Sequence, residues 1–187
     1  KTPRFAERTG IAHIPQDRQG RGLVLDFSVA ENMIMRNYYR PPIAPKIFIN
    51  QSLMSNYASN LVEKYDVRTP NIQTLGRSLS GGNQQKVVVA REIEQNPDLL
   101  VAAQPTRGLD VGAIEFIHQK LIEQREAGKA ILLISLELDE ILALADRILV
   151  MYEGQISGEL TSAEATEEKI GLLMVGGHAK GGEPVAN

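Results

Sequence analysis

The sequence predicts an α/β protein in which a parallel sheet carries an inserted helical segment. Short apolar runs at residues 99–103 and 130–135 alternate with segments of helical character at 82–95 and 112–127. Continuous apolar strands that alternate with helices are typical of parallel sheets covered on both faces. Residues 29–95, in contrast, contain helical patterns and no convincing strand. We therefore expect a helical subdomain inserted into an α/β core.

The N-terminal half adds three elements to this outline. The apolar run at 11–15 predicts a strand, and residues 29–39 predict a helix that ends at Pro41-Pro42. A second helix is expected at 51–66, because apolar residues recur there at the helical spacing of four. The residues of this stripe are Leu53, Tyr57, Leu61 and Tyr65.

The C-terminal part predicts a helix, a hairpin and a last helix. They are expected at 138–145, at 147–152 with 155–160 around the turn Glu153-Gly154, and at 164–175. Residues 177–187 contain several glycines and no periodicity, which favours a flexible tail.

Composition narrows the class of protein further. The chain has 187 residues, of which 43% are hydrophobic, enough for one domain with a core of its own. A net charge of −3 gives no electrostatic footprint for nucleic acid, and no apolar stretch reaches the ~20 residues of a membrane span. Cysteine is absent, and the three histidines share no metal-ligand spacing. We therefore expect no disulfide, no metal site and no nucleic-acid partner.

The most informative run is Leu-Ser-Gly-Gly-Asn-Gln-Gln-Lys at residues 79–86. A Ser-Gly-Gly turn that opens a helix can bind phosphate, since its backbone N–H groups are accessible and the helix N-terminus is partly positive. The alternative is an ordinary helix start in which Ser80 is only the cap. An apolar strand and the sequence Gln-Pro-Thr-Arg-Gly-Leu-Asp at 104–110 follow shortly after, and they favour phosphate binding.

With these motifs in this order, the chain resembles the nucleotide-binding subunit of an ABC transporter. Residues 79–84 match the family's signature motif, 97–110 its Walker B strand with the D-loop, and 13–16 its Q-loop. The resemblance extends from about Gly10 to Gly176. It implies an incomplete P-loop-NTPase (RecA-like) parallel sheet core with an inserted ABC-type α-helical subdomain.

Smaller features resemble the carbohydrate and nucleoside uptake branch of that family. They are Gln16-Asp-Arg before Gly22-Leu23, the run Pro-Thr-Arg-Gly-Leu-Asp-Val-Gly at 105–112, and Ser135-x-Glu137-Leu138. In that branch two such domains lie in tandem on one polypeptide. The chain looks most like the second of the pair, and nucleoside import is the single function that the resemblance favours most.

ATP-hydrolysing members of the family carry a Gly-x-x-x-x-Gly-Lys-Ser/Thr loop, and the sequence contains no such run. We therefore expect the chain to be the C-terminal part of a domain, downstream of its P-loop. Four segments are expected: residues 1–28, the N-terminal part of the α/β core with the Q-loop; 29–95, the helical subdomain that ends in the signature helix; 96–176, the α/β core with a degenerate Walker B, the D-loop and the switch; and 177–187, the tail.

The resemblance also locates the family's catalytic positions, and none of them is intact. The aspartate that holds Mg²⁺ through water is replaced by Ala103, and the glutamate that polarises the attacking water by Gln104. Alanine offers no ligand oxygen, and glutamine cannot accept a proton at ordinary pH. Leu136 stands where the family has its switch histidine, after Ser135. This ATPase-type chain is therefore expected to be inactive on its own.

The signature motif, by contrast, is intact, and in the family it completes the ATP site of a partner domain that packs head to tail. The resemblance assigns nucleotide contact in trans to Ser80, Gly81, Gly82 and Gln84. It assigns the dimer seam to Asp110 and coupling to the membrane subunit to Gln16. For Asp110 a helix N-cap, and for Gln16 a solvated strand-end residue, remain the structural alternatives.

The implied cofactors are ATP and Mg²⁺ in the intact protein, with none expected on this chain alone. The implied partners are a second ATP-binding domain and transmembrane permease subunits, at the cytoplasmic face of a bacterial-type plasma membrane. Self-association is also expected, because an incomplete sheet leaves an edge unpaired. Two other function classes stay open: a non-transport ABC-type ATPase of the DNA-repair or chromosome class, and a non-catalytic interaction or regulatory fragment.

Overall fold

The computed structural model describes residues 9–44 and 48–177. The chain divides after Ile134 into two compact units, which are described separately below. The first eight residues of the expected N-terminal segment lie outside the described residues. So do residues 178–187 of the expected tail, including His178.

The first unit is built on a parallel sheet of three strands in the order β1-β2-β3. The strands are β1 (Ile11–Ile14), β2 (Leu99–Ala103) and β3 (Ala130–Ile134). Ile11 lies beside Leu99, and Leu99 beside Ala130, so the central strand β2 is the one that precedes Gln104. The predicted α/β class and parallel sheet are confirmed.

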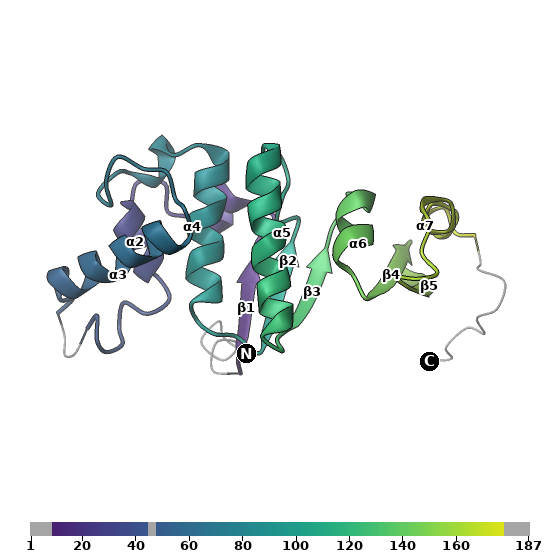
Figure 1. Ribbon diagram of the computed structural model, residues 1–187, viewed down its shortest axis with the longest axis horizontal. Coiled ribbons are helices and arrows are strands. Elements are labelled where there is room, and N and C mark those ends of the chain that lie inside the picture. Colours follow the sequence, from purple (N-terminus) through teal and green to yellow (C-terminus); the bar gives the residue numbers. More distant parts are fainter. Residues whose placement is uncertain (1–8, 45–47, 178–187) are drawn as a thin grey trace. The chain divides into compact units, whose positions relative to one another are not determined.

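Two helices, α4 (Gly81–Ile93) and α5 (Val111–Glu126), run antiparallel to these strands. They lie side by side along the sheet (Figure 1). The strand residues that alternate towards the covered face are fully buried, namely Ala12, Ile14, Leu100 and Ala102. On the other face, Leu132 is 48% exposed and Ile134 49%. Within the described residues the sheet is thus covered on one face, whereas apolar strands predicted cover on both.

The helical segment contains α2 (Val29–Ile34) and α3 (Gln51–Lys64), with the short turns η1 (Arg18–Gly22) and η2 (Gly76–Ser78) before and after them. Helix α2 starts at a capping box between Ser28 and Glu31 and stops five residues before the predicted end. Non-helical turns occupy the interval up to Pro41, where asparagine and tyrosine residues have low helix propensity.

Helix α3 turns a different face towards the core from the one predicted. Met54, Ala58, Leu61 and Tyr65 are buried, whereas Leu53 is 37% exposed. The predicted stripe is therefore wrong at Leu53, and Met54 and Ala58, which also follow helical spacing, are buried instead. Helix α3 packs against α2. Burial and a hydrogen bond to Glu94 raise the pKa of the Tyr65 hydroxyl above its ordinary value.

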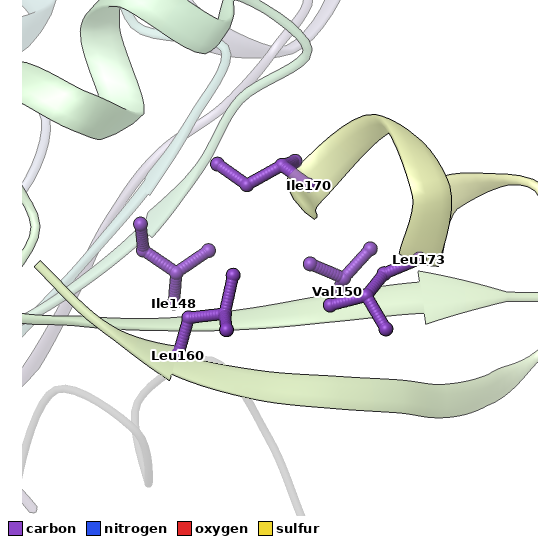
Figure 2. Close-up of a cluster of buried hydrophobic side chains, with 5 residues drawn as sticks. All are labelled: Ile148, Val150, Leu160, Ile170 and Leu173. Carbon is purple, nitrogen blue, oxygen red and sulfur yellow. The ribbon is translucent and has the colours of Figure 1, made fainter. Parts of the chain in front are cut away.

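The second unit consists of α6 (Leu138–Leu144), the antiparallel hairpin β4 (Arg147–Tyr152) and β5 (Gln155–Thr161), and α7 (Glu167–Met174). Glu153 and Gly154 both have positive φ, as a two-residue hairpin turn requires. Figure 2 shows the apolar cluster that joins the hairpin to α7, made of Ile148, Val150, Leu160, Ile170 and Leu173. No helix among the described residues is long and apolar enough to cross a membrane.

The free edge of β3 leads to a prediction about the isolated chain. In the described residues β3 pairs with β2 alone, and its apolar side chains at 132 and 134 are half exposed. Unpaired edges and apolar patches favour association. We expect light scattering to give a mass that rises with concentration, and Leu132→Lys to reduce this rise. A monomer of constant mass in the unmodified chain would contradict the prediction.

Candidate functional site

The N-termini of α4 and α5 converge on a pocket of about 340 Å³. The pocket is lined by Asp66, Arg68, Ser80, Gly82, Asn83, Lys86, Asp110, Gly112, Ala113 and Phe116. Residues from three parts of the sequence therefore meet here: the end of α3, the signature turn and the D-loop. Two helix N-termini at one pocket direct partial positive charge towards it, which favours an anionic ligand.

Each of the two helices starts with a side-chain cap. The Ser80 hydroxyl accepts hydrogen bonds from the backbone N–H of Asn83 (3.4 Å) and from its side-chain amide (2.9 Å). Asp110 Oδ1 accepts from the backbone N–H of Ala113 at 2.9 Å. Both caps occupy oxygen lone pairs, so the Ser80 hydroxyl proton remains available for an acceptor in the pocket. The capping role of Ser80 is compatible with a role in binding.

Glycine at position 82 is needed for the two helices to approach. A Cβ atom there would lie 3.0 Å from the Cβ of Ala113 and 3.4 Å from Asp110 Oδ2. A side chain at this position would require Ala113 or Asp110 to shift by a few tenths of an ångström. The second signature glycine thus keeps the backbone N–H groups of both helices at one pocket.

Charged groups surround the pocket in pairs. Lys86 Nζ lies 2.7 Å from Asp66 Oδ2 and 4.5 Å from the centre of the Phe116 ring. The hydrogen bond from Lys86 holds the pKa of the Asp66 carboxyl below its ordinary value, and the charge of Arg68 acts in the same direction. Because Asp66 stays ionised, Lys86 is compensated, and Arg68 contributes an exposed positive charge at the rim.

Gln84 does not line this pocket. Its side chain is 2% exposed, donates to the carbonyl of Gly76 at 3.0 Å and accepts from Gln19 at 3.0 Å. The next residue, Gln85, is equally buried and donates to the carbonyl of Pro105 at 2.7 Å. These two amides tie the signature helix to the segment before it and to the D-loop. The amide at the pocket is that of Asn83, which the sequence analysis had not selected.

Gln16 is exposed and lies just beyond β1, between the sheet and η1. The following residue, Asp17, caps η1: its carboxylate accepts from the backbone N–H groups of Gln19 (3.2 Å) and Gly20 (2.9 Å). Gln19 then contacts the signature helix through Gln84. The Q-loop candidate is therefore followed by a rigid turn fixed to α4.

The three degenerate positions lie where two strands end. Ala103 is the last residue of β2, and Gln104 follows with φ 49° and a backbone N–H that donates to the carbonyl of Ile134 at 2.7 Å. Positive φ is uncommon for glutamine and costs on the order of 1–3 kcal/mol. Leu136, in the second unit, is 72% exposed. None of these side chains can supply a carboxylate or an imidazole.

A second pocket, of about 350 Å³, lies between β1, α2 and the C-terminal end of α4. Its wall contains Glu92, which is 1% exposed. The Glu92 carboxylate forms ion pairs with Arg36 Nη1 at 3.1 Å and with Arg91 Nε at 2.9 Å. Arg91 also lies 3.7 Å from the sulfur of Met35. This ion-pair cluster holds α2 against α4.

The sheet, the inserted helices and the two capped helix starts together define the fold of an ATP-binding cassette. Among solved structures, the dimeric post-hydrolysis state of an ATP-binding cassette bound to ADP and phosphate superposes with a TM-score of 0.71 at 21% identity. The superposition covers 87% of this chain and 68% of the cassette chain. A nucleotide-free ATP-binding cassette from an ABC transporter gives a TM-score of 0.69 at 24% identity, over 93% of this chain and 68% of that one.

Sequence relatives narrow the comparison to import proteins. The chain is 55% identical over 96% of its length to the guanosine import ATP-binding protein of Bacillus subtilis, and 49% identical over 94% to the nucleoside import ATP-binding protein of Lactococcus lactis. A ribose import ATP-binding protein of Bacillus subtilis is 41% identical over 95%. The chain spans 35%, 35% and 36% of these relatives, about a third of their length. No family model matches it.

Proposed function

We propose that the chain is the second, non-hydrolysing nucleotide-binding half of an importer, and that nucleosides are the class of solute carried. Two relatives, at 55% and 49% identity, are named for guanosine and nucleoside import, which favours nucleosides over the glucose and ribose of relatives at 43% and 42% identity. In this proposal the half contributes its signature turn to a nucleotide bound by a partner domain.

The observation that carries the proposal is the pocket at the two helix N-termini. Ser80, Gly81 and Gly82 would donate to the γ-phosphate of ATP, with Asn83 in place of the buried Gln84 as the fourth residue. The site suits a phosphate because the N-termini of α4 and α5 both face it and because Gly82 keeps them close. ATP and Mg²⁺ would be held chiefly by the partner's phosphate-binding loop.

The half's own site would be silent. Ala103 and Gln104 offer no carboxylate at the end of β2, and the 187 residues contain no Gly-x-x-x-x-Gly-Lys-Ser/Thr run. We propose that the loop belonging to this half lies outside the present sequence. The expected segments 1–28, 29–95, 96–176 and 177–187 remain our proposal for how the full domain is divided.

The other partners follow from the same proposal. The half would sit at the cytoplasmic face of the membrane, with Asp110 at the seam with the partner domain. Gln16, exposed beyond β1, would contact a transmembrane permease and report the state of the nucleotide to it. Co-purification of the full-length protein with a polytopic permease, in an amount that depends on Gln16, would support this arrangement. A protein that co-purifies with DNA instead would contradict it.

The isolated chain is expected to bind Mg-ATP weakly. The signature turn meets only the end of the triphosphate, and no group described here would hold its β-phosphate. Calorimetric titration is therefore expected to show no micromolar affinity. The double substitution Ala103→Asp with Gln104→Glu restores both carboxylates and is still expected to give no turnover. Micromolar binding by the unmodified chain would contradict the assignment of the phosphate-binding loop to the partner.

A further inference from the structure

Arg18 contacts two motifs that the proposed function treats separately. It is the first residue of η1, two positions after Gln16. Its Nη1 donates to the carbonyl oxygen of Arg107 at 2.9 Å, across 89 residues of sequence. Arg107 lies within the D-loop, three residues before Asp110. One guanidinium therefore joins the segment after Gln16 to the D-loop.

The same guanidinium lies against the signature turn. A Cβ atom at Gly81 would be 2.7 Å from Arg18 Nη2, so no side chain fits at position 81 unless Arg18 moves. Gly81 has ordinary helical geometry at the first position of α4, and its backbone conformation does not require glycine. The Arg18 guanidinium, at the end of a flexible side chain, is therefore the group that any side chain at position 81 would have to displace.

The position of Arg18 is electrostatically unusual. A cation beside a helix N-terminus is repelled by the helix dipole, which favours anions there. Arg18 Nε is also buried without a hydrogen-bond partner among the described residues. The segment that carries it is nevertheless rigid, because Asp17 caps η1 and Gln19 bonds to Gln84 of α4. A phosphate at the start of α4 would turn this repulsion into attraction.

We propose that Arg18 is a positioning residue that couples the Q-loop segment to the signature turn and the D-loop. This inference rests on the proposed function. When an anionic phosphate approaches Gly81, Arg18 is drawn towards α4 and carries η1 and the adjacent Gln16 with it. In the opposite direction, a displacement of Gln16 by the permease shifts Gly81 and the Arg107 carbonyl together.

A double-mutant cycle in the full-length protein, assembled with its permease, tests the link. Gly81→Ala alone is expected to lower the ATPase rate about tenfold, because its methyl group displaces Arg18. In an Arg18→Ala background, the same Gly81→Ala change is expected to cost less than about twofold, because the space is then empty. Equal losses in both backgrounds would overturn the proposal, since glycine would then be required for a reason unrelated to Arg18.

Coupling is measured in the same preparations as solute transported per ATP hydrolysed. Arg18→Lys keeps the positive charge but loses the guanidinium's ability to contact Gly81 and the Arg107 carbonyl at the same time. The amount of solute transported per ATP hydrolysed is therefore expected to fall about threefold or more. Arg77→Ala is the matched control: Arg77 also precedes the signature turn, is exposed, and its guanidinium pairs with exposed Asp26. A ratio for Arg18→Lys equal to that of Arg77→Ala would overturn the proposal.

Thermal unfolding of each full-length variant separates coupling from folding. If Arg18→Ala lowers the Tm, the cycle is repeated with Arg18→Lys, whose shorter cation also leaves space at position 81. The proposed function itself is tested by the ATPase rate of the Ser80→Arg variant in the same assay. Loss of activity in Ser80→Arg together with normal coupling in Arg18→Lys would remove this inference alone.

Discussion

Ser80→Arg in the full-length protein, assembled with the proposed permease, is expected to lower the steady-state ATPase rate by about 10²–10³-fold. Ser80 starts α4 at the pocket shared with α5, and its hydroxyl proton is free to donate. An arginine side chain would fill the 340 Å³ pocket and remove both the cap and the donor. Loss of one donor to a developing charge has an effect of this size in other enzymes.

Gln104→Ala in the same protein is the control and is expected to change the rate by less than about twofold, because a silent site has no rate to lose. Equal losses from Ser80→Arg and Gln104→Ala would mean that the silent site belongs to the other half. Gly81→Asp gives a less direct answer, since its carboxylate would meet the Arg18 guanidinium. If residues 79–83 were only a helix start, Gly81→Asp would be tolerated, as acidic residues near a helix N-terminus usually are.

Local signals predicted the elements around the site well. Ser80 and Asp110 are strong N-cap residues placed just before helical patterns, and the structure starts α4 and α5 immediately after them. The apolar run at 99–103 coincides with β2, because Pro97 precedes it and Pro105 and Gly108 follow it. Helix starts and strand ends of this kind depend on residues that are adjacent in sequence, so they can be predicted from one sequence alone.

The inward turn of Gln84 was not predictable in the same way. The resemblance assigned Gln84 to nucleotide contact, yet Gln84, Gln85 and Lys86 are all buried. Their partners include the carbonyl groups of Gly76 and Pro105 and the carboxylate of Asp66, which lie 8, 20 and 20 residues away in sequence. Hydrogen bonds to distant backbone carbonyls leave no mark in periodicity. The role of Arg18 escaped for the same reason.

The uncovered face of the sheet has a different cause. The apolar character of β3 predicts two covered faces, and Leu132 and Ile134 are half exposed. The composition of a strand reflects everything that packs on it in the native protein. The exposure of Leu132 and Ile134 reflects only their neighbours among the described residues.

Glu92→Gln is expected to lower the free energy of unfolding by about 3 kcal/mol. The Glu92 side chain is 2% exposed, and its carboxylate forms ion pairs with Arg36 at 3.1 Å and with Arg91 at 2.9 Å. Glutamine keeps the shape and removes the charge, so the Arg91 guanidinium, 6% exposed, would stay buried without a counter-ion. Removing one partner of a buried ion pair costs roughly 3–5 kcal/mol, and the adjacent open pocket, which can admit solvent, places this case near the lower limit.

Glu94→Gln, two residues further along, is the matched control. Glu94 pairs with the half-exposed Lys64 at 2.6 Å and accepts from the Tyr65 hydroxyl at 2.8 Å, with 22% of its side chain exposed. Its loss is expected to cost about 1 kcal/mol, because water screens the pair and glutamine can still accept from Tyr65. Urea unfolding of the two variants and the parent, fitted with a common slope, measures both changes. Equal destabilisation would show that the ion-pair cluster around Glu92 contributes no more than an ordinary surface pair, and that packing alone holds α2 against α4.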